Sequence, residues 1–232
     1  EDFVDTTGCQ LFPLRMCCHR WVENVPVCER AIVLIPRIRK YLTAVATGKY
    51  AQPNTISFAV VRDSCNSYHL LLAKLKFFLS VAKQVTPFLT FYQTDKPMAT
   101  FLCDDLFKLV KSLMAHFVKP SVTKDLTSPA KLNSTQVTKN ENLLEYSKVE
   151  IGFESECALK VVVKEKKVTD RNVLDFRLCC RKWLAIMVGK LVDKTAVQYS
   201  LSRNMSFLDP RAIKNTEKNQ LRLKSILGQL VQ

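Results

Sequence analysis

Apolar residues recur every three or four positions over most of this chain, a spacing that places them on one face of an α-helix. The clearest run covers 69–93, where an apolar stripe lies opposite a face of Lys, Ser and Gln. The same spacing predicts helices over 23–50, 58–65, 98–118, 170–193 and 217–231, and again from residue 155 onward. We therefore expect a mainly α fold.

Capping and breaking residues refine these helices. Pro36 and Pro87 lie inside two of them and should kink or split each one, because proline lacks an N–H and clashes with the preceding turn. Gly48 is a natural helix stop. Ser57 is the expected N-cap of the helix over 58–65, and Asp170 is that of the helix over 170–193.

Two stretches lack the helical pattern. Residues 1–22 carry turn signals around a short apolar run at 11–16, which indicates a loop with one possible strand. Residues 120–150 are rich in Ser, Thr, Asn and Lys, which is typical of a long polar loop or linker. The β-branched run at 161–163 leaves a strand open as an alternative to helix. The expected organisation is 1–22, 23–119, 120–150 and 151–232.

Composition narrows the class of protein. The chain has 232 residues, of which 47% are hydrophobic, so a largely disordered chain is excluded. Its apolar runs are short: the one at 31–35 is stopped by Pro36 and Arg37, whereas a membrane span needs about 20 apolar residues. We expect no membrane partner. Only five glycines also favour helices over a turn-rich β fold.

The nine cysteines are odd in number and form no C-x-x-C motif. Cys17, Cys18 and His19 lie together, but no second ligand pair follows at the spacing of a zinc site. We interpret the cysteines as small buried hydrophobes and reduced thiols, which indicates the cytosol or the nucleus. The acidic first residues lack an apolar leader, and we expect the chain to be a piece of a longer polypeptide.

Positive charge is concentrated in the last third of the chain. The net charge is +14, and residues 160–232 hold 16 Lys and Arg against 6 Asp and Glu. Such a field attracts polyanions such as DNA, although a solvated lysine-rich surface has the same composition. Arg177, Arg181 and Lys182, on the helix over 170–193, are our candidates for DNA contact.

Local motifs offer little catalytic chemistry. Asp104 and Asp105 are adjacent, but neighbours on a helix point about 100° apart, and their place in the first turns favours a helix-dipole role. No P-loop, nucleophile elbow or zinc-protease motif is present. Arg20 and Trp21 stand out instead, because arginine can pair with a phosphate and tryptophan can stack on a base. The alternative is that Trp21 packs in the core.

Three motifs in order resemble the hAT superfamily of transposases and proteins derived from them. They are Phe12-Pro13-Leu14 with Arg20-Trp21, Asn24-Val25-Pro26 and Glu29-Arg30-Ala31; then Phe88-Leu89 with Tyr92-Gln93-Thr94-Asp95; then Phe207-Leu208-Asp209-Pro210-Arg211. The resemblance covers nearly all of the chain. It departs from the family at His19, where Thr is usual.

The resemblance implies an RNase H-like core split by a large helical insertion. Residues 1–22 would end the first half of that core, and 23–119 and 151–232 would form two parts of the insertion. In the family, two Asp and one Glu hold divalent metal for DNA cleavage and joining, and they lie outside the segment that this chain resembles. We therefore expect no catalytic residue and no cofactor here. The resemblance implies that Trp21 stacks on a flipped base beside Arg20.

The sequence thus predicts a non-enzymatic, nuclear, helical segment of an hAT transposase-like or domesticated protein. It would provide structural support, help subunits to associate and contact DNA electrostatically. The alternative is a helical protein–protein interaction module without DNA binding. A third possibility is a complete enzyme in which Asp104 or Asp209 joins a site formed by the fold.

Overall fold

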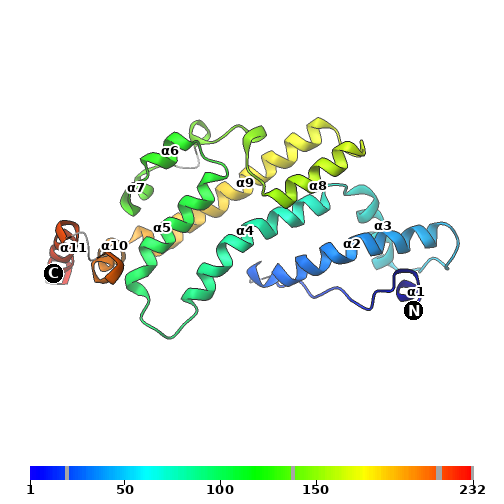
Figure 1. Cartoon of the computed structure of the whole chain (residues 1–232), viewed down its shortest axis with the longest axis horizontal. Helices are drawn as coiled ribbons and strands as arrows, with labels where there is room; N and C mark the ends of the chain where they lie inside the picture. Colours follow the sequence, from blue (N-terminus) through cyan, green and yellow to red (C-terminus); the bar gives the residue numbers. More distant parts are fainter. Residues whose placement is uncertain (19–20, 137–138, 213–215, 231–232) are drawn as a thin grey trace. The chain divides into compact units, whose positions relative to one another are not determined.

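The computed structural model describes residues 1–18, 21–136, 139–212 and 216–230, and it is mainly helical (Figure 1). The chain divides into two compact units. Unit 1 comprises Glu1–Ala82 and Gly152–Val173, and unit 2 comprises Lys83–Ile151 and Leu174–Gln232. Within the described residues the only pairing of β type is an isolated bridge between Val118 and Leu143. The expected mainly α class is confirmed.

Unit 1 combines helices from two separate segments of the chain, Glu1–Ala82 and Gly152–Val173. It contains α1 (Asp2–Thr7), η1 (Trp21–Asn24), α2 (Val25–Ala46), α3 (Ile56–Ser67), the first part of α4 (Leu71–Tyr92), α8 (Phe153–Lys164) and the start of α9 (Asp170–Lys194). Phe3 of α1 packs edge-on against Tyr41 of α2, with ring centroids 5.7 Å apart. The buried Ser155 hydroxyl donates to the carbonyl of Ala73 at 2.9 Å, which joins α8 to α4.

Unit 2 contains α5 and the larger part of α9. Its elements are the end of α4, α5 (Ala99–Ala115), α6 (Pro120–Asp125), α7 (Pro129–Ser134), η2 (Asn140–Asn142), η3 (Tyr146–Lys148), the rest of α9, η4 (Ala196–Gln198), α10 (Ser200–Met205), η5 (Ser206–Leu208), η6 (Pro210–Ala212) and α11 (Thr216–Leu230). On α9 every fourth residue is buried, in the series Phe176, Cys180, Leu184, Val188 and Val192. This series is the stripe that faces the core.

The segment 8–18 corrects the expectation of a strand near the N-terminus. Gly8 ends α1 in a left-handed conformation (φ +63°), and the chain then runs irregularly. Side chains of unit 1, rather than a neighbouring strand, bond part of its backbone. The Asn24 amide bonds both the N–H and the carbonyl of Cys17 at 2.7 Å, and Arg30 donates to the Phe12 carbonyl at 3.0 Å.

Helix starts differ from expectation in the capping residue. The Thr55 hydroxyl, not that of Ser57, accepts the N–H of Phe58 at 3.2 Å and caps α3. At the start of α9, Thr169 and Asn172 bond each other through side chain and backbone, so the cap precedes Asp170 by one residue. At α3 the capping Thr55 has an extended backbone, which the presence of a hydroxyl residue in the sequence cannot reveal.

The two internal prolines do not split their helices. α2 continues through Pro36 and α4 through Pro87. Buried neighbours explain the continuity at Pro36, because Leu34 is 2% exposed and Ile35 is 6% exposed. Burial of these side chains offsets the cost of the lost hydrogen bond. Gly48, with φ +77°, lies just after the end of α2, as expected of a helix stop. Residues 161–163 belong to α8 rather than to a strand.

Residues 120–150 are not the polar linker that their composition indicates. They contain two short helices and lie wholly within unit 2. Single apolar residues spaced along the described part of the segment are buried: Leu126, Leu132, Leu143 and Val149. The Lys119 N–H donates to the Asn142 carbonyl, and the Leu144 N–H to the Phe117 carbonyl, at 2.9 and 2.8 Å. The segment therefore packs as part of the unit.

All nine cysteines are free thiols. Cys9, Cys65, Cys103 and Cys180 are buried, in agreement with the interpretation as small hydrophobes, whereas Cys18, Cys157 and Cys179 are exposed. Burial and the nearby Asp104 raise the pKa of Cys103 to about 11, so this thiol stays protonated at neutral pH.

Gly152 provides a test of the packing in unit 1. Its φ is +85°, and a Cβ added there would lie 2.6 Å from the Cβ of Ser80. We expect Gly152→Ala to lower the free energy of unfolding by about 2–4 kcal/mol, from backbone strain plus overpacking. Urea denaturation measures the change.

Gly48→Ala is the matched control, because its φ is also positive and nothing lies within 4 Å of its added Cβ. It should cost only about 1–2 kcal/mol. Ser80→Gly should rescue part of the loss in the double variant. Equal costs at Gly48 and Gly152 would contradict the packing argument.

Candidate functional site

A buried carboxylate, Asp209, lies between η5 and η6 with 3% of its surface exposed. The Arg211 side chain holds it: Nε donates to both carboxylate oxygens at 3.0 Å, and Nη2 lies 2.9 Å from Oδ2. The backbone N–H of Arg211 donates to Oδ1 at 2.8 Å. This geometry satisfies a charge that could not be buried alone.

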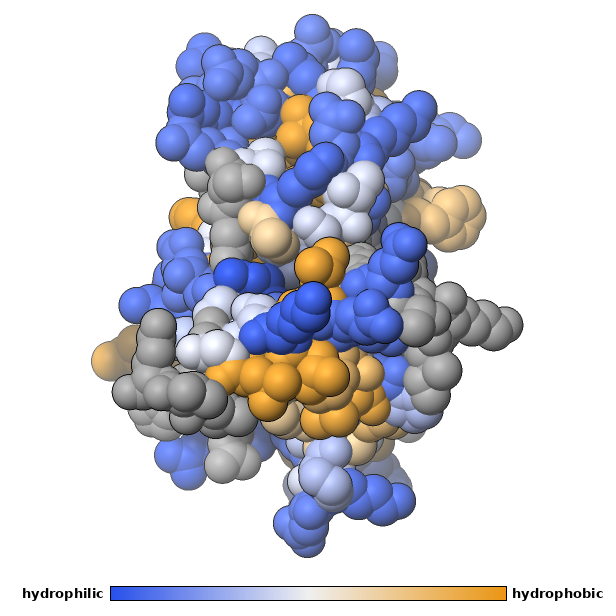
Figure 2. Space-filling model, turned by 90° about the vertical axis from the view of Figure 1, so that its left-hand side faces the viewer, coloured by the Kyte–Doolittle hydropathy of each residue, from blue (hydrophilic) through white to orange (hydrophobic). Residues whose placement is uncertain are grey.

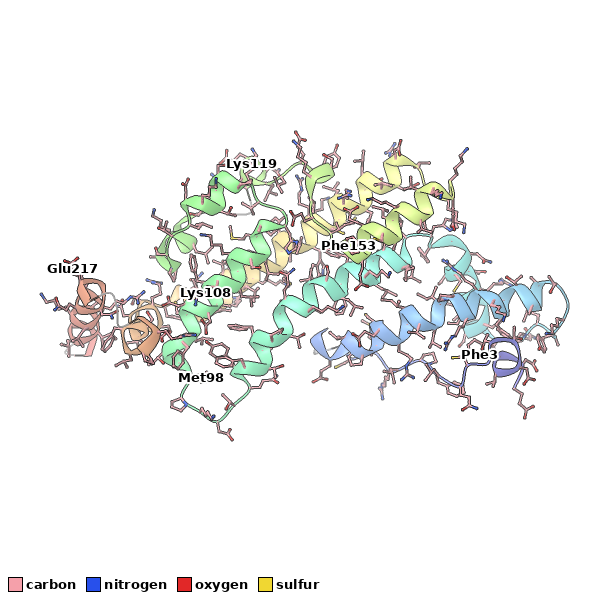
Figure 3. All side chains as sticks on the ribbon, viewed as in Figure 1. Phe3, Met98, Lys108, Lys119, Phe153 and Glu217 are labelled. Carbon is pink, nitrogen blue, oxygen red and sulfur yellow. The ribbon has the colours of Figure 1, made fainter. Side chains whose placement is uncertain are left out.

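The same guanidinium reaches a second carboxylate on α5. Nη1 and Nη2 of Arg211 each lie 3.3 Å from Oδ2 of Asp105. The Tyr92 hydroxyl donates to that oxygen at 3.0 Å, and Lys108, labelled in Figure 3, donates to Oδ1 at 3.2 Å. The guanidinium also lies 4.6 Å from the ring centre of Phe101.

This arrangement shifts the pKa values of Asp209 and Tyr92 in opposite directions. Burial alone raises the pKa of Asp209, but the hydrogen bonds and charge of Arg211 outweigh it, so the pKa is lowered overall. Burial, together with the hydrogen bond to Asp105 and its charge, raises the pKa of Tyr92 well above its usual range. Asp209 therefore remains ionised and Tyr92 remains protonated at neutral pH.

The chemistry of this cluster is that of an ionic lock. Asp105 and Asp209 share an arginine as their common cation, and Asp104 lies 3.9 Å from Arg222 rather than beside Asp105. Among the described residues, no three His, Cys, Asp or Glu side chains are grouped in a way that could hold a metal ion. The cluster joins the 209–211 turn to α5 and to the end of α4.

The candidate DNA-contacting residues fall in different places. Arg20 lies outside the described residues. Trp21 begins η1, but its side chain is also outside what the structure describes. Arg177, Arg181 and Lys182 lie on α9 within unit 2. The structure therefore brings three of the five candidates together on one helix.

The two arginines of α9 also hold the chain beside them. Nη1 of Arg177 donates to the Val149 carbonyl at 2.8 Å, and Nη1 of Arg181 donates to the Leu144 carbonyl at 2.7 Å. Both side chains are half-buried, whereas Lys182 is exposed. Lys182 is thus the candidate on α9 that is best placed to meet a polyanion without loss of an internal bond.

Residues of the resemblance motifs are structural anchors. Tyr92 and Arg211, from the second and third motifs, meet at Asp105. Phe12 and Arg30, both from the first motif, bond each other through the Phe12 carbonyl. No local pattern in the sequence assigns these residues to one site, since Arg211 and Asp105 lie 106 positions apart.

Comparison with protein-family models, with curated proteins and with solved structures finds no match. None of the helices in the described residues combines the length and the apolar character that crossing a membrane requires. A functional assignment of this chain therefore rests on the chemistry and placement of its own residues.

Arg211→Ala should destabilise the protein by about 2–3 kcal/mol at pH 7, because it leaves the Asp209 carboxylate buried without its partner. The contribution of Asp209 is present above its ordinary pKa of 3.8 and is lost as the pH falls through its lower folded value. We thus expect the difference from the wild-type protein to shrink below about pH 4. Urea titrations from pH 3 to 7 measure it.

Lys108→Ala is the control, because Lys108 contacts the same Asp105 but is 70% exposed. An exposed pair should contribute at most about 1 kcal/mol. A loss in Lys108→Ala as large as that in Arg211→Ala would contradict the role given to Asp209.

Proposed function

We propose that this chain is a non-catalytic helical part of an hAT transposase-like or domesticated-transposase protein, in which it supports the fold, helps subunits to associate and contacts DNA. The observation that carries the proposal is the placement of the motif residues. Tyr92 is distant in sequence from Asp209 and Arg211, and Asp105 bonds both Tyr92 and Arg211, while Arg211 also bonds Asp209. Such a shared ionic lock supports the interpretation of these motifs as parts of one insertion.

The charge of the chain supports the DNA contact. The net charge is +14, most of it within residues 160–232, and Lys182 projects from α9 as an exposed cation. A basic surface of this kind binds the phosphate backbone with strong salt dependence and without reading bases. The same proposal places the protein in the nucleus and gives Trp21 the stacking role at an unpaired base.

Lys182→Ala should weaken DNA binding and lower the slope of log K against log salt by about one, since one phosphate contact is lost. Fluorescence anisotropy with a duplex and a hairpin-ended duplex, from about 50 to 200 mM salt, measures this. Trp21→Ala should leave the salt slope unchanged but remove any preference for the hairpin.

Lys96→Ala is the matched control, because Lys96 is an exposed lysine of unit 2 outside α9. It should leave binding nearly unchanged. Binding that is absent at 50 mM salt, or that ignores salt, would exclude the DNA contact. An equal effect of both lysine variants would show that only net charge matters.

The second candidate is a protein-interaction module, and exposed apolar residues near the C-terminus favour it. Figure 2 views the molecule from the side on which Figure 1 draws α10 and α11. It shows apolar surface among hydrophilic side chains there. The large exposed apolar residues of this part of unit 2 are Leu201, Leu208, Leu221, Leu223 and Leu227. The partner that we propose for them is a second copy of the chain, since closed pairs commonly bury one patch on both subunits.

Leu221→Glu should weaken self-association by about tenfold or more, because it puts a charge into a desolvated contact. Leu221 is 69% exposed, so the fold itself should tolerate the change. Sedimentation equilibrium measures the association constant. Val60→Glu is the control, since Val60 is 58% exposed on α3. A wild-type chain that stays monomeric at high concentration would contradict this candidate.

A further inference from the structure

Unit 1 contains a hollow of about 480 Å³ that neither the sequence motifs nor the basic helix α9 accounts for. It lies against α2, α3 and the turn that follows α8. Three cations line it, Arg39, Arg62 and Lys167, together with His69 and Thr43. A hollow of this size accommodates a small ligand rather than a single ion.

A smaller hollow of about 180 Å³ shares two of these residues. His69 and Lys167 line both, and the second adds Lys74, Asn172 and the ring of Tyr68. Tyr68 is 58% exposed, so its face is accessible at the edge of the hollow. The two hollows are therefore neighbours that share His69 and Lys167, and Tyr68 lines the smaller one.

The charge of this region stays positive after its acidic neighbours are counted. Asp63 lies 2.9 Å from Nε of Arg62, and Glu165 lies 2.8 Å from Nζ of Lys167. The Lys167 hydrogen bond and charge, with a smaller effect of Arg39, lower the pKa of Glu165, so this carboxylate is ionised. Four cations against two carboxylates leave an excess of two positive charges.

The turn that carries Lys167 has an unusual backbone. Lys166 has φ +53°, a left-handed conformation in which glycine is usual at the end of a helix. A lysine there costs backbone energy that a glycine would avoid. The strained residue holds Lys167 at the edge of both hollows, and strain of this kind is concentrated at ligand sites.

We propose that this pair of hollows is a phosphate-binding site. A phosphate carries two charges and several acceptor oxygens, which suits donors that converge from Arg39, Arg62 and Lys167. A second phosphate, one linkage away, would lie near Lys74 in the smaller hollow. The site takes either a soluble diphosphate compound or the backbone of a nucleic-acid strand. It does not depend on the DNA contact of α9.

Isothermal titration of the whole chain with inorganic pyrophosphate at about 50 mM salt tests the proposal, since screening is weak there. We expect binding with a stoichiometry of one. Arg39→Gln and Lys167→Gln should each weaken it by about tenfold or more, as expected for loss of a charge-assisted hydrogen bond. Because Arg39 is half-buried, the exposed Lys167 guards against a variant that simply misfolds.

Lys96→Gln is the matched control, since it removes the same charge from an exposed position of unit 2 that has no role in the proposed DNA contact. It should leave pyrophosphate binding unchanged. No heat of binding at millimolar pyrophosphate would overturn the site, and so would equal weakening in Lys96→Gln, which would mean that only the overall field attracts the anion. A negative pyrophosphate titration would overturn this site without affecting the proposed DNA contact, which is tested by hairpin preference and by the salt slope.

A single-stranded oligonucleotide, added as competitor, separates the two sources of phosphate. Displacement of pyrophosphate that is weakened by Tyr68→Ala would assign the site to a nucleic-acid strand, because stacking on an exposed ring adds to backbone contacts. Tyr68→Ala should not change pyrophosphate binding itself. Failure of the oligonucleotide to compete would assign the site to a soluble phosphate compound.

Discussion

The buried charge of Asp209 determines how the C-terminal part of unit 2 folds. A carboxylate with 3% exposure requires donors around it, and Arg211 supplies two side-chain nitrogens and a backbone N–H from two residues away. This requirement forces a tight turn through Pro210. Because the same guanidinium reaches Asp105, the turn is bonded to α5, and Tyr92 extends the contact to α4. In the same part of unit 2, α10 packs against α5, and α11 packs against α10 and η5.

The helices could be predicted because periodicity is local, and tertiary packing mostly reinforces it. Their ends could not be predicted to the residue, since Thr55 and Ser57 offer similar hydroxyls and only the extended backbone at Thr55 identifies the cap. The packing of residues 120–150 into unit 2 could not be predicted for a different reason. Leu126 and Leu132 lie singly between polar neighbours, so no pattern along the chain reveals that each is buried.

The candidate site shows a sharper limit of the same kind. Charge density selected α9 as the candidate, but a count of cations cannot distinguish an arginine that bonds a carbonyl from a lysine that meets solvent. The partners of Arg181 and Arg177 lie 37 and 28 residues away, and the Arg211–Asp105 contact spans 106. Pairings at such separations depend on the completed fold, so no local pattern predicts them.

The discontinuity of unit 1 has a consequence for synthesis on the ribosome. Its core is completed by residues 152–173, and the Ser155 to Ala73 bond joins positions 82 apart. The first 82 residues therefore emerge without the helix that covers them, and they wait while the whole of 83–151 is translated. Contacts so distant in sequence slow folding and leave apolar surface exposed in the meantime. A nascent chain halted before residue 152 would be a natural substrate for chaperones.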